Sequence, residues 1–421
     1  MKPYQFLAIG FFLGFTALVT NGLADNSIVT SPSVPAKSRQ SSAQPLGSKL
    51  STLDPDTVSG FSHLYNLQYD QAIAAFDRTF KRYPTDPFAL NHLLQAILLQ
   101  EMYRLNALDT TLYADNGFLA GKPLAGDPQV KARILELSDE GVRLGNERLK
   151  QDPNDVDALY ARGVSRGLRL SYLAIVEKSF LTAVRNVNAS RSDHEKVLQI
   201  DPSYTDAKLI VGMHNYVIGS LPFPVRLLAG VIGVSGNKKK GIEYLKEVAA
   251  SKSEASIDAR VTLALFLRRD GQYDTACEVM RSLAAQFPHN FIFALEEANL
   301  LKDAGHGPEA VTAYNRVLRA AADGFYAEPH LERAEFGLAE SLRGQHKSEE
   351  SLAAYQLALT AKPDVQAEIK LRSLLGEGLM NDALNHREAA LKDYQAVVAF
   401  DPNSPQAAVA RKWLKQPYSY P

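Results

Sequence analysis

Few side chains in this sequence stand at a spacing that could do chemistry. The nine histidines include no pair four residues apart, the spacing that turns two imidazoles of one helix toward a metal ion, and no His-Glu-x-x-His occurs. Glu296-Glu297 and Glu349-Glu350 are adjacent in sequence, so their carboxylates point to different helix faces and we expect both pairs to be solvated. No Gly-x-Ser-x-Gly elbow and no complete P-loop is present. The sequence therefore predicts a protein that is not an enzyme, with no metal ion and no cofactor.

Charge and cysteine content argue against two further classes. The 421 residues carry 46 Lys and Arg against 47 Asp and Glu, without the surplus of cations that neutralises phosphates, so we expect no nucleic-acid partner. The single cysteine, Cys277, cannot form an internal disulfide or a thiolate metal cage, and we expect it to be buried. The basic run at 236–241 lacks the Gly-Lys-Ser/Thr order of a P-loop, and we expect it to cap a helix.

The first fifty residues have the composition of an export signal followed by a tether. Lys2 precedes an apolar run at 6–19 that is too short to span a bilayer, and small residues at 22 and 24 fit a signal-peptidase site. We expect cleavage after Ala24 and a flexible Ser-, Pro- and Gln-rich linker at 25–50. Assuming a bacterial source, this predicts export to the periplasm. An uncleaved membrane anchor is the alternative.

A pattern of small and aromatic residues recurs at helical spacing down the chain. Its first copy is Tyr69-x-x-Ala72-Ile73-x-x-Phe76-x-x-x-Phe80, followed by the helix-stopping Pro84. Later copies keep a small residue and an aromatic or apolar residue four positions on: Tyr273, Ala276, Met280, Leu283 and Pro288; Ala310, Tyr314 and Val317; Ser351, Tyr355, Ala358 and Pro363; Ala390, Tyr394, Val397 and Pro402.

Close packing of two antiparallel helices explains this pattern. The small residue lets the partner helix approach, the aromatic residue fills the gap to the next helix pair, and the proline stops the second helix. Each pair alone leaves an apolar face in water, so the pairs must stack. We therefore expect an elongated, curved rod that ends in a capping helix at 405–415, with Trp413 covering the last pair.

With its unit of about 34 residues, the pattern resembles the tetratricopeptide repeat (TPR) family. The first-helix pattern of that family is also present, as Leu263-Ala264-x-x-Leu267 and Leu338-Ala339-x-x-Leu342. The resemblance covers about residues 51–416 and is strongest at 53–86 and 256–402. It implies an all-α fold, a right-handed α-solenoid of stacked antiparallel helix pairs. The intervals between residues 84 and 253 exceed one repeat and predict longer helices or inserted loops.

In TPR proteins the first helices line a concave groove that receives a peptide or a helix of a partner. The positions that map to this groove are Arg268, Arg269, Asn299, Lys302, Arg333, Phe336, Glu340 and Arg343, with Asn215 and Tyr216 on the earlier wall. Cations outnumber anions in this set, so the resemblance implies an acidic or C-terminal peptide held by charge-assisted hydrogen bonds. The Lys-x-x-x-Asn clamp of cytosolic chaperone-binding relatives is missing, because Leu295 precedes Asn299.

Two inserts interrupt the repeats. Residues 221–234 are apolar and too short to span a bilayer, and we expect an extra helix packed on the solenoid, with a hydrophobic-partner or membrane-surface contact as the alternative. Together with 235–245 they resemble a segment of the mitochondrial outer-membrane tetratricopeptide family linked to inclusion-body clearance. The second insert is a glycine-rich loop within 103–128, which is either a connector or a binding loop.

The sequence thus predicts five parts: a signal peptide (1–24), a linker (25–50), irregular TPR-like repeats with inserts (51–254), regular repeats (255–402), and a capping helix with a tail (403–421). We expect an exported, non-catalytic scaffold that binds a protein or peptide in its groove, in cell-envelope assembly. The alternative is a membrane-associated TPR factor that handles lipid or outer-membrane components through an uncleaved anchor or the 221–234 insert. An enzyme with its site within 103–128 would lack an acid, a base and a nucleophile.

Overall fold

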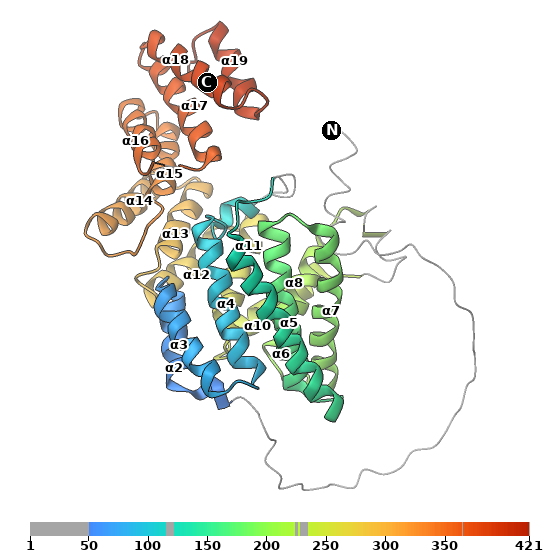
Figure 1. The fold of residues 1–421 in the computed structure, drawn as a ribbon. Helices are drawn as coiled ribbons and strands as arrows, with labels where there is room; N and C mark the ends of the chain where they lie inside the picture. The colour runs from blue at the N-terminus through green and yellow to red at the C-terminus, as the bar shows by residue number, and fades with distance from the viewer. Residues whose placement is uncertain (1–49, 115–121, 224–225, 228–234, 364, 421) are drawn as a thin grey trace.

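A computed structural model describes residues 50–114, 122–223, 226–227, 235–363 and 365–420 (Figure 1). These residues form helices and connecting turns, and no strand occurs among them. The all-α prediction is therefore confirmed. The signal peptide predicted at 1–24 and nearly all of the linker at 25–50 lie outside the described residues.

The helices run antiparallel in successive pairs, and each packs against the next in the chain. Their bounds are η1 (Leu50–Leu53), α2 (Pro55–Tyr65), α3 (Tyr69–Arg82), α4 (Pro87–Arg104), η2 (Thr110–Tyr113), α5 (Pro128–Gln151), α6 (Val156–Ser171), η4 (Tyr172–Val176), α7 (Phe180–Ile200), α8 (Ala207–Gly219), α10 (Lys238–Ala249), α11 (Ser256–Arg269), α12 (Tyr273–Gln286), α13 (Phe291–Asp303), α14 (Gly307–Ala322), α15 (Leu331–Gly344), α16 (Ser348–Thr360), α17 (Ala367–Ala383), α18 (Arg387–Phe400) and α19 (Pro405–Lys415).

Side-chain caps and prolines set where many of these helices begin. Asp86 accepts a hydrogen bond from the backbone N–H of Phe88 ahead of α4, and Pro87 occupies the first turn. Asn237 caps α10 in the same way through Lys240, which confirms the capping role expected for the basic run at 236–241. Gly271, with φ of +71°, lies just beyond the end of α11, where a left-handed residue stops the helix.

The predicted close approach of helices is present at the aromatic positions of the repeat. A Cβ atom added to Gly337 on α15 would lie 2.4 Å from the Tyr314 ring, and one on Gly376 would lie 2.3 Å from the Tyr355 ring. Both tyrosines thus fill the gap to the next helix pair, as predicted. Tyr394 instead packs on Gly378, in the first helix of its own pair.

Longer helices account for the long intervals before residue 253. Helix α4 has 18 residues, α5 has 24 and α7 has 21. A π-helical turn, η4, follows α6 directly, and the chain then turns into α7. The predicted longer helices are therefore confirmed.

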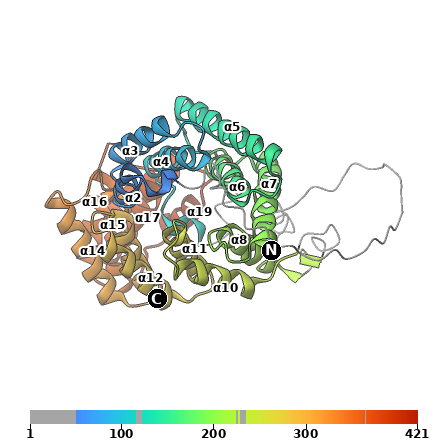
Figure 2. The ribbon, with the colours of Figure 1, turned by 90° about the horizontal axis from the view of Figure 1, so that it is seen from below.

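The superhelix closes on itself, unlike the elongated, curved rod expected from the sequence. Figure 2 shows the helices following one another around a ring, so that α2 and α4 come beside α11. The Tyr65 hydroxyl donates to Asp258 at 3.2 Å, and the Asn290 side chain donates to the Tyr65 carbonyl at 2.7 Å. One apolar cluster joins residues of α3 and α4, such as Phe76 and Leu94, with residues of α13 and α14. Packing between successive turns of the superhelix therefore adds to the packing between neighbours.

The C-terminal end extends from this ring as a separate stack (Figure 1). There α17, α18 and α19 share an apolar cluster that contains Tyr394 and Ala407, and Trp413 packs against it. The helix predicted at 405–415, and the position of Trp413 over the last pair, are confirmed.

Candidate functional site

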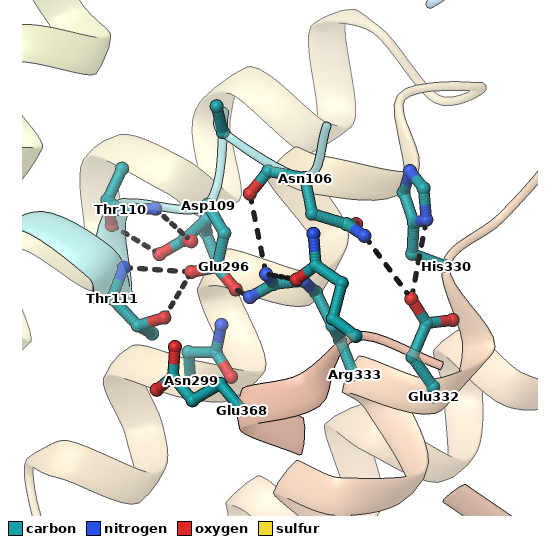
Figure 3. Close-up of polar contacts among 12 residues, drawn as sticks. Asn106, Asp109, Thr110, Thr111, Glu296, Asn299, His330, Glu332, Arg333 and Glu368 are labelled. Carbon is teal, nitrogen blue, oxygen red and sulfur yellow. Dashed lines mark hydrogen bonds and ion pairs between the residues drawn. The ribbon is translucent and has the colours of Figure 1, made fainter. Parts of the chain in front are cut away.

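The inner surface of the C-terminal repeats holds a segment of the same chain. Residues 105–113, which follow α4, lie in contact with side chains of α11, α13 and α15 (Figure 3). We call this stretch the inner segment. Near its start, Asn106 has a φ of +56° and turns the chain out of α4, and the segment ends in the short helix η2. The inner segment occupies the surface on which an extended peptide is expected to lie in a TPR groove.

A buried ion pair fixes the centre of the inner segment. The Asp109 carboxylate pairs with the Arg333 guanidinium of α15, and the two side chains are 4% and 6% exposed. Although burial opposes ionisation, the charge of Arg333 lowers the pKa of Asp109. Arg333 also donates to the Asn106 carbonyl at 3.4 Å, so it binds both a side chain and the backbone of the segment. A further hydrogen bond, to Gln366 at 2.9 Å, links Arg333 to the turn before α17.

The next residue of the segment, Thr110, is bound by a carboxylate of α13. Its backbone N–H and its hydroxyl donate to the two oxygens of Glu296, at 2.8 and 2.6 Å. Arg268 of α11 donates to the Thr110 hydroxyl at 2.8 Å and to Glu296 at 2.7 Å. Burial raises the pKa of Glu296, the Arg268 charge lowers it, and the nearby Asp109 raises it, with a net upward shift.

Contacts at the start of the segment extend the site toward α17. Asn106 lies 3.5 Å from Glu332, which also pairs with Lys362 at 2.8 Å. Burial opposes ionisation of Glu332, but hydrogen bonds from His330 and Lys362 lower its pKa to about 2. The Gln366 amide donates to the Leu105 carbonyl at 2.9 Å. Side chains from four consecutive first helices and their flanking turns therefore hold the segment.

The structure brings several of the predicted groove residues together, but on a peptide of their own chain. Arg268, Arg269 and Arg333 all donate to residues of the inner segment, Arg269 through the Tyr113 carbonyl at 2.7 Å. Asn299 is buried and accepts a hydrogen bond from Tyr314 at 2.6 Å, and Lys302 pairs with Asp303 at 2.6 Å. The side chains at these five positions thus have partners within the chain.

Of the remaining predicted groove residues, some take part in packing between helices and others lie close to an open surface. Tyr216 is buried, stacks on Phe266 at 3.8 Å and donates to Asp270 at 2.8 Å, while Asn215 accepts from the Asn237 backbone at 3.1 Å. Tyr216 is therefore part of the packing between α8 and α11. Phe336, Glu340 and Arg343 lie on α15 beyond the inner segment, next to the open surface described below.

The solvated state expected of Glu296-Glu297 is wrong, because both residues are buried. They do point to different faces: Glu296 toward the inner segment, and Glu297 toward Arg281 at 3.0 Å and Arg316 at 2.6 Å. Two adjacent acidic residues on a helix suggested exposed side chains. In the structure each is buried beside arginines, Glu296 beside Arg268 and Glu297 beside Arg281 and Arg316, and these opposite charges offset the cost of burial. Glu349 and Glu350 are exposed as expected, and Cys277 is buried as expected.

An open hollow of about 240 Å³ lies among α15, α17 and α19, toward the C-terminus from the inner segment's contacts with α11 and α13. Its lining combines two arginines, an acid and apolar side chains from α15, α17 and α19: Glu340, Arg343, Arg372, Leu375, Leu379, Gln406 and Val409 among them. Arg343 pairs with Glu340 at 2.9 Å and keeps 32% of its side chain exposed. Arg372 lies over the Phe336 ring at 4.4 Å and is 43% exposed. We call this surface the open hollow.

The structure describes most of the insert at 103–128 but only part of the insert at 221–234. Within 103–128 the inner segment is ordered by the contacts above, and Asp127 N donates to Glu101 at 2.7 Å, while 115–121 lie outside the described residues. Of 221–234, Leu221 is buried, whereas Phe223 and Leu227 are 68% and 59% exposed. No grouping of His, Cys, Asp and Glu among the described residues could hold a metal ion. No described helix combines the length and the apolar character that a membrane crossing requires.

Comparisons with known proteins agree with the helical architecture. Tetratricopeptide-repeat family models match residues 295–365 and, separately, residues 59–86 and 258–290. The chain belongs to the tetratricopeptide repeat family. No curated protein matches the sequence. Members of this family act as scaffolds for protein interaction, so the chain is a protein-interaction scaffold.

Solved structures that resemble the chain are TPR solenoids at low sequence identity. A chain of the APC/C hetero-tetramer Cut9-Hcn1 is 12% identical with a TM-score of 0.50, over 88% of this chain and 57% of that one. PilF of Pseudomonas aeruginosa is 16% identical (62% and 99% covered, TM-score 0.40), and yeast Tom70 is 12% identical (86% and 88%, TM-score 0.40). This likeness shows the fold alone. The chain spans little more than half the length of the first of these proteins.

Proposed function

We propose that this protein is an exported, non-catalytic scaffold of the cell envelope that binds an extended segment of a protein partner in the open hollow. The observation that supports this proposal is the inner segment. A peptide of this chain lies on the concave side, held through its carbonyls, one carboxylate and one hydroxyl. The adjoining surface on α15 and α17 has arginines and an acid in partly exposed positions.

The open hollow favours a partner segment that combines an acidic side chain with an apolar one. Arg343 and Arg372 are partly exposed, and their guanidinium groups pair with Glu340 at 2.9 Å and with Glu368 at 3.4 Å. A carboxylate of the partner would exchange with these acids and could be bound in a bidentate manner. Leu375, Leu379 and Val409 provide the apolar floor. A surface built on rigid helices needs little ordering on binding, which lowers the entropic cost of association.

A charge-reversal series tests the proposal, and it needs a check on folding because Arg343 also contacts Glu340 and the buried Tyr355. We expect the double variant Arg343→Glu and Arg372→Glu to lose crosslinked partners captured from the native envelope, with an unchanged circular dichroism spectrum. Arg319→Glu is the matched control, because Arg319 is exposed on the second helix α14 and contacts only the backbone of its own helix at 3.2 Å. Equal capture by the double variant and the control would reject the open hollow as the binding surface. Arg268 is unsuitable for this test, since its side chain is only 1% exposed.

The export part of the proposal rests on the N-terminal sequence. We expect a mature chain that begins at Asp25 and is found in the soluble periplasmic fraction. Exposed Phe223 and Leu227 favour the second candidate, a membrane-associated factor that handles lipid or outer-membrane components. Mass spectrometry of the N-terminus in each cell fraction separates the two, because an intact Met1 in the membrane fraction supports the anchored form.

A further inference from the structure

Two arginines on first helices occupy the same position in consecutive repeats. Arg333 of α15 holds the inner segment, and Arg372 of α17 lines the open hollow. A residue in the left-handed region lies just beyond each helix, His346 with a φ of +59° after α15 and Asn385 with a φ of +64° after α17. Each arginine comes thirteen residues before that residue, and both helices are uninterrupted, so the two positions correspond.

The surroundings of the two arginines correspond as well. The glycine four residues after each one, Gly337 or Gly376, packs against a tyrosine ring of the preceding helix. Repeats that stack with the same geometry present one position to the same side of the solenoid. Because Arg333 faces the inner segment, Arg372 faces the same side one repeat closer to the C-terminus.

The partners of the two arginines differ in burial. Asp109, the partner of Arg333, is 4% exposed. Glu368, which lies 3.4 Å from Arg372, is 55% exposed. An exposed ion pair within one helix contributes little to stability, because water screens both charges. A carboxylate from a partner therefore replaces Glu368 at small cost.

The charges that line the open hollow favour one carboxylate. Among the described residues of the lining, Arg343 and Arg372 are accompanied by one acid, Glu340. Glu340 pairs with Arg343 at 2.9 Å and also accepts a hydrogen bond from Tyr355. Arg372 thus supplies the positive charge that the lining does not balance, and one carboxylate makes the hollow neutral.

The inner segment crosses the repeats in the direction opposite to their order. Gln366, in the turn before α17, donates to the Leu105 carbonyl. Arg269 of α11 donates to the Tyr113 carbonyl. The earlier residues of the segment therefore lie at the later helices. An acid bound by Arg372 in the same way is preceded by residues toward α19 and followed by residues toward α15.

Apolar side chains lie where the residue before that acid is expected. In the inner segment this residue is Leu108, which packs against the apolar cluster that α4 and α13 share. In the open hollow Leu375 and Leu379 of α17 and Val409 of α19 form the apolar floor. The two sites thus repeat one arrangement, an apolar contact beside a carboxylate contact.

We infer that the partner segment in the open hollow carries an apolar residue followed directly by an acid, and that it crosses the repeats in the direction of the inner segment. This inference rests on the proposed function, since it concerns the ligand of the same surface. Arg372 binds the carboxylate in a bidentate manner, and the apolar residue covers Leu379 and Val409. Arg343 of α15 donates to the backbone that follows the acid.

The residue after the acid distinguishes the open hollow from the site of the inner segment. Glu296, which binds Thr110, comes nine residues before Gly305, the left-handed residue beyond α13. The same position of α15 is Gly337, nine residues before His346, and it has no side chain to bind a hydroxyl. We therefore expect the partner segment to need the acid but not a threonine after it.

Fluorescence polarisation with a labelled, end-blocked peptide of residues 106–112 tests the inference on the whole protein. The inner segment keeps its own place, because its attachment to the chain gives it a high effective concentration. We expect Asp109→Asn in the peptide to weaken binding about tenfold or more, the loss of hydrogen bonds to a charged group. Thr110→Val in the peptide should leave the affinity unchanged. Equal losses from both changes would mean that the peptide has replaced the inner segment, and would overturn the inference.

Variants of the protein locate the bound peptide. Arg372→Gln should weaken the peptide as strongly as Asp109→Asn does, and combining the two should add little. Arg372→Lys, which keeps the charge but not the planar fork, should give an intermediate affinity. Arg319→Gln is the matched control on the exposed side of α14. Equal binding by Arg372→Gln and this control, with unchanged circular dichroism, would overturn the inference.

Photocrosslinking measures the direction of the peptide. A photoreactive leucine in place of Leu108 should attach to α17 or α19, and one in place of Leu112 should attach to α15. The reverse pattern, or attachment to α11 and α13 alone, would overturn the inference.

Capture of partners from the native envelope separates this inference from the proposed function. If the Arg343→Glu and Arg372→Glu double variant loses its partners while the peptide binds equally well without its acid, the hollow binds a segment of other chemistry and only the inference fails. If the double variant keeps its partners, the proposed function fails as well.

Discussion

At the scale of single residues, the contacts that hold this protein together fall into two kinds. Apolar contacts between helices depend on glycine beside a large ring, as for Gly376 and Tyr355. Polar contacts on the inner surface are buried and charged, as for Asp109 and Arg333. The first kind was foreseeable from the repeat pattern, and the second can join residues far apart in sequence, 224 positions for Asp109 and Arg333.

Replacing Gly376 by alanine tests the first kind of contact. The added Cβ would lie 2.3 Å from the ring of Tyr355, which is fully buried and has no room to move. We expect the free energy of unfolding in urea to fall by about 1–3 kcal/mol, despite the better helix propensity of alanine. Gly344→Ala is the control, because nothing lies within 4 Å of its added Cβ, and this variant should be neutral or more stable. Equal effects of the two substitutions would contradict the packing argument.

Removing one partner of the buried ion pair tests the second kind. Arg333→Met leaves Asp109 buried without its cation, and we expect a loss of about 3–5 kcal/mol of unfolding free energy. Adding Asp109→Asn removes the isolated charge and keeps an acceptor for the Thr111 backbone N–H, which Asp109 binds at 2.8 Å. The double variant should therefore be more stable than Arg333→Met alone. A double-mutant cycle with purely additive effects would show that the pair is not coupled.

At the scale of elements, the inner segment joins two ends of the repeat array. The segment follows α4, near the start of the solenoid. It contacts α11, α13 and α15, which belong to the second half of the chain (Figure 3). The inner segment fills part of the concave side of the repeats, and the open hollow is a part that it leaves unfilled. The segment thus sets which repeats are available to a partner.

Hydrogen exchange tests how the inner segment is held. Thr110→Val removes the hydroxyl that donates to Glu296 and accepts from Arg268. We expect faster amide exchange across residues 105–113 and unchanged exchange in α18, because local opening does not require global unfolding. Thr312→Val is the control, since that hydroxyl is exposed on α14 and bonds only to the Pro308 carbonyl at 3.0 Å. Unchanged exchange at 105–113 would mean that Thr110 does not fasten the segment.

At the scale of the whole molecule, closure of the superhelix brings acidic residues of α11 against α2 and α4. Asp258 receives hydrogen bonds from both helices, and burial raises its pKa to about 6 from an ordinary value of 3.8. A carboxyl group whose pKa is higher in the folded state stabilises the fold fully below its unfolded pKa. This contribution is lost as the pH rises through the folded pKa.

The pH dependence of stability tests this closure contact. We expect Asp258→Asn and the unmodified protein to unfold with similar free energy near pH 3.5. Between pH 4 and pH 7 the variant should gain relative to the unmodified protein, by at most about 3 kcal/mol because the carboxylate is partly exposed. Paired urea titrations at each pH measure this difference, and a constant difference across the range would contradict the raised pKa.

The sequence by itself determined the repeating unit and therefore the helices. Residues such as Ala276, Tyr355 and Pro363 act on neighbours within one or two helices, and local spacing records such contacts directly. The same pattern identified the inner helix faces, and hence Arg268, Arg269 and Arg333 as residues facing a groove. The starts of α4 at Pro87 and of α19 at Pro405 also depend on local sequence, since a proline and its capping residue act within one turn.

Only the tertiary structure decided what meets on the inner surface. The angle between successive helix pairs accumulates along the chain, and a small change in each pair determines whether the superhelix stays open or closes. No local pattern encodes that sum, so the contact of Tyr65 with Asp258 and the binding of Thr110 by Glu296 could not be predicted. Glu296 is the clearest case: its sequence neighbours suggested an exposed carboxylate, and a segment 186 residues earlier in the chain buries it.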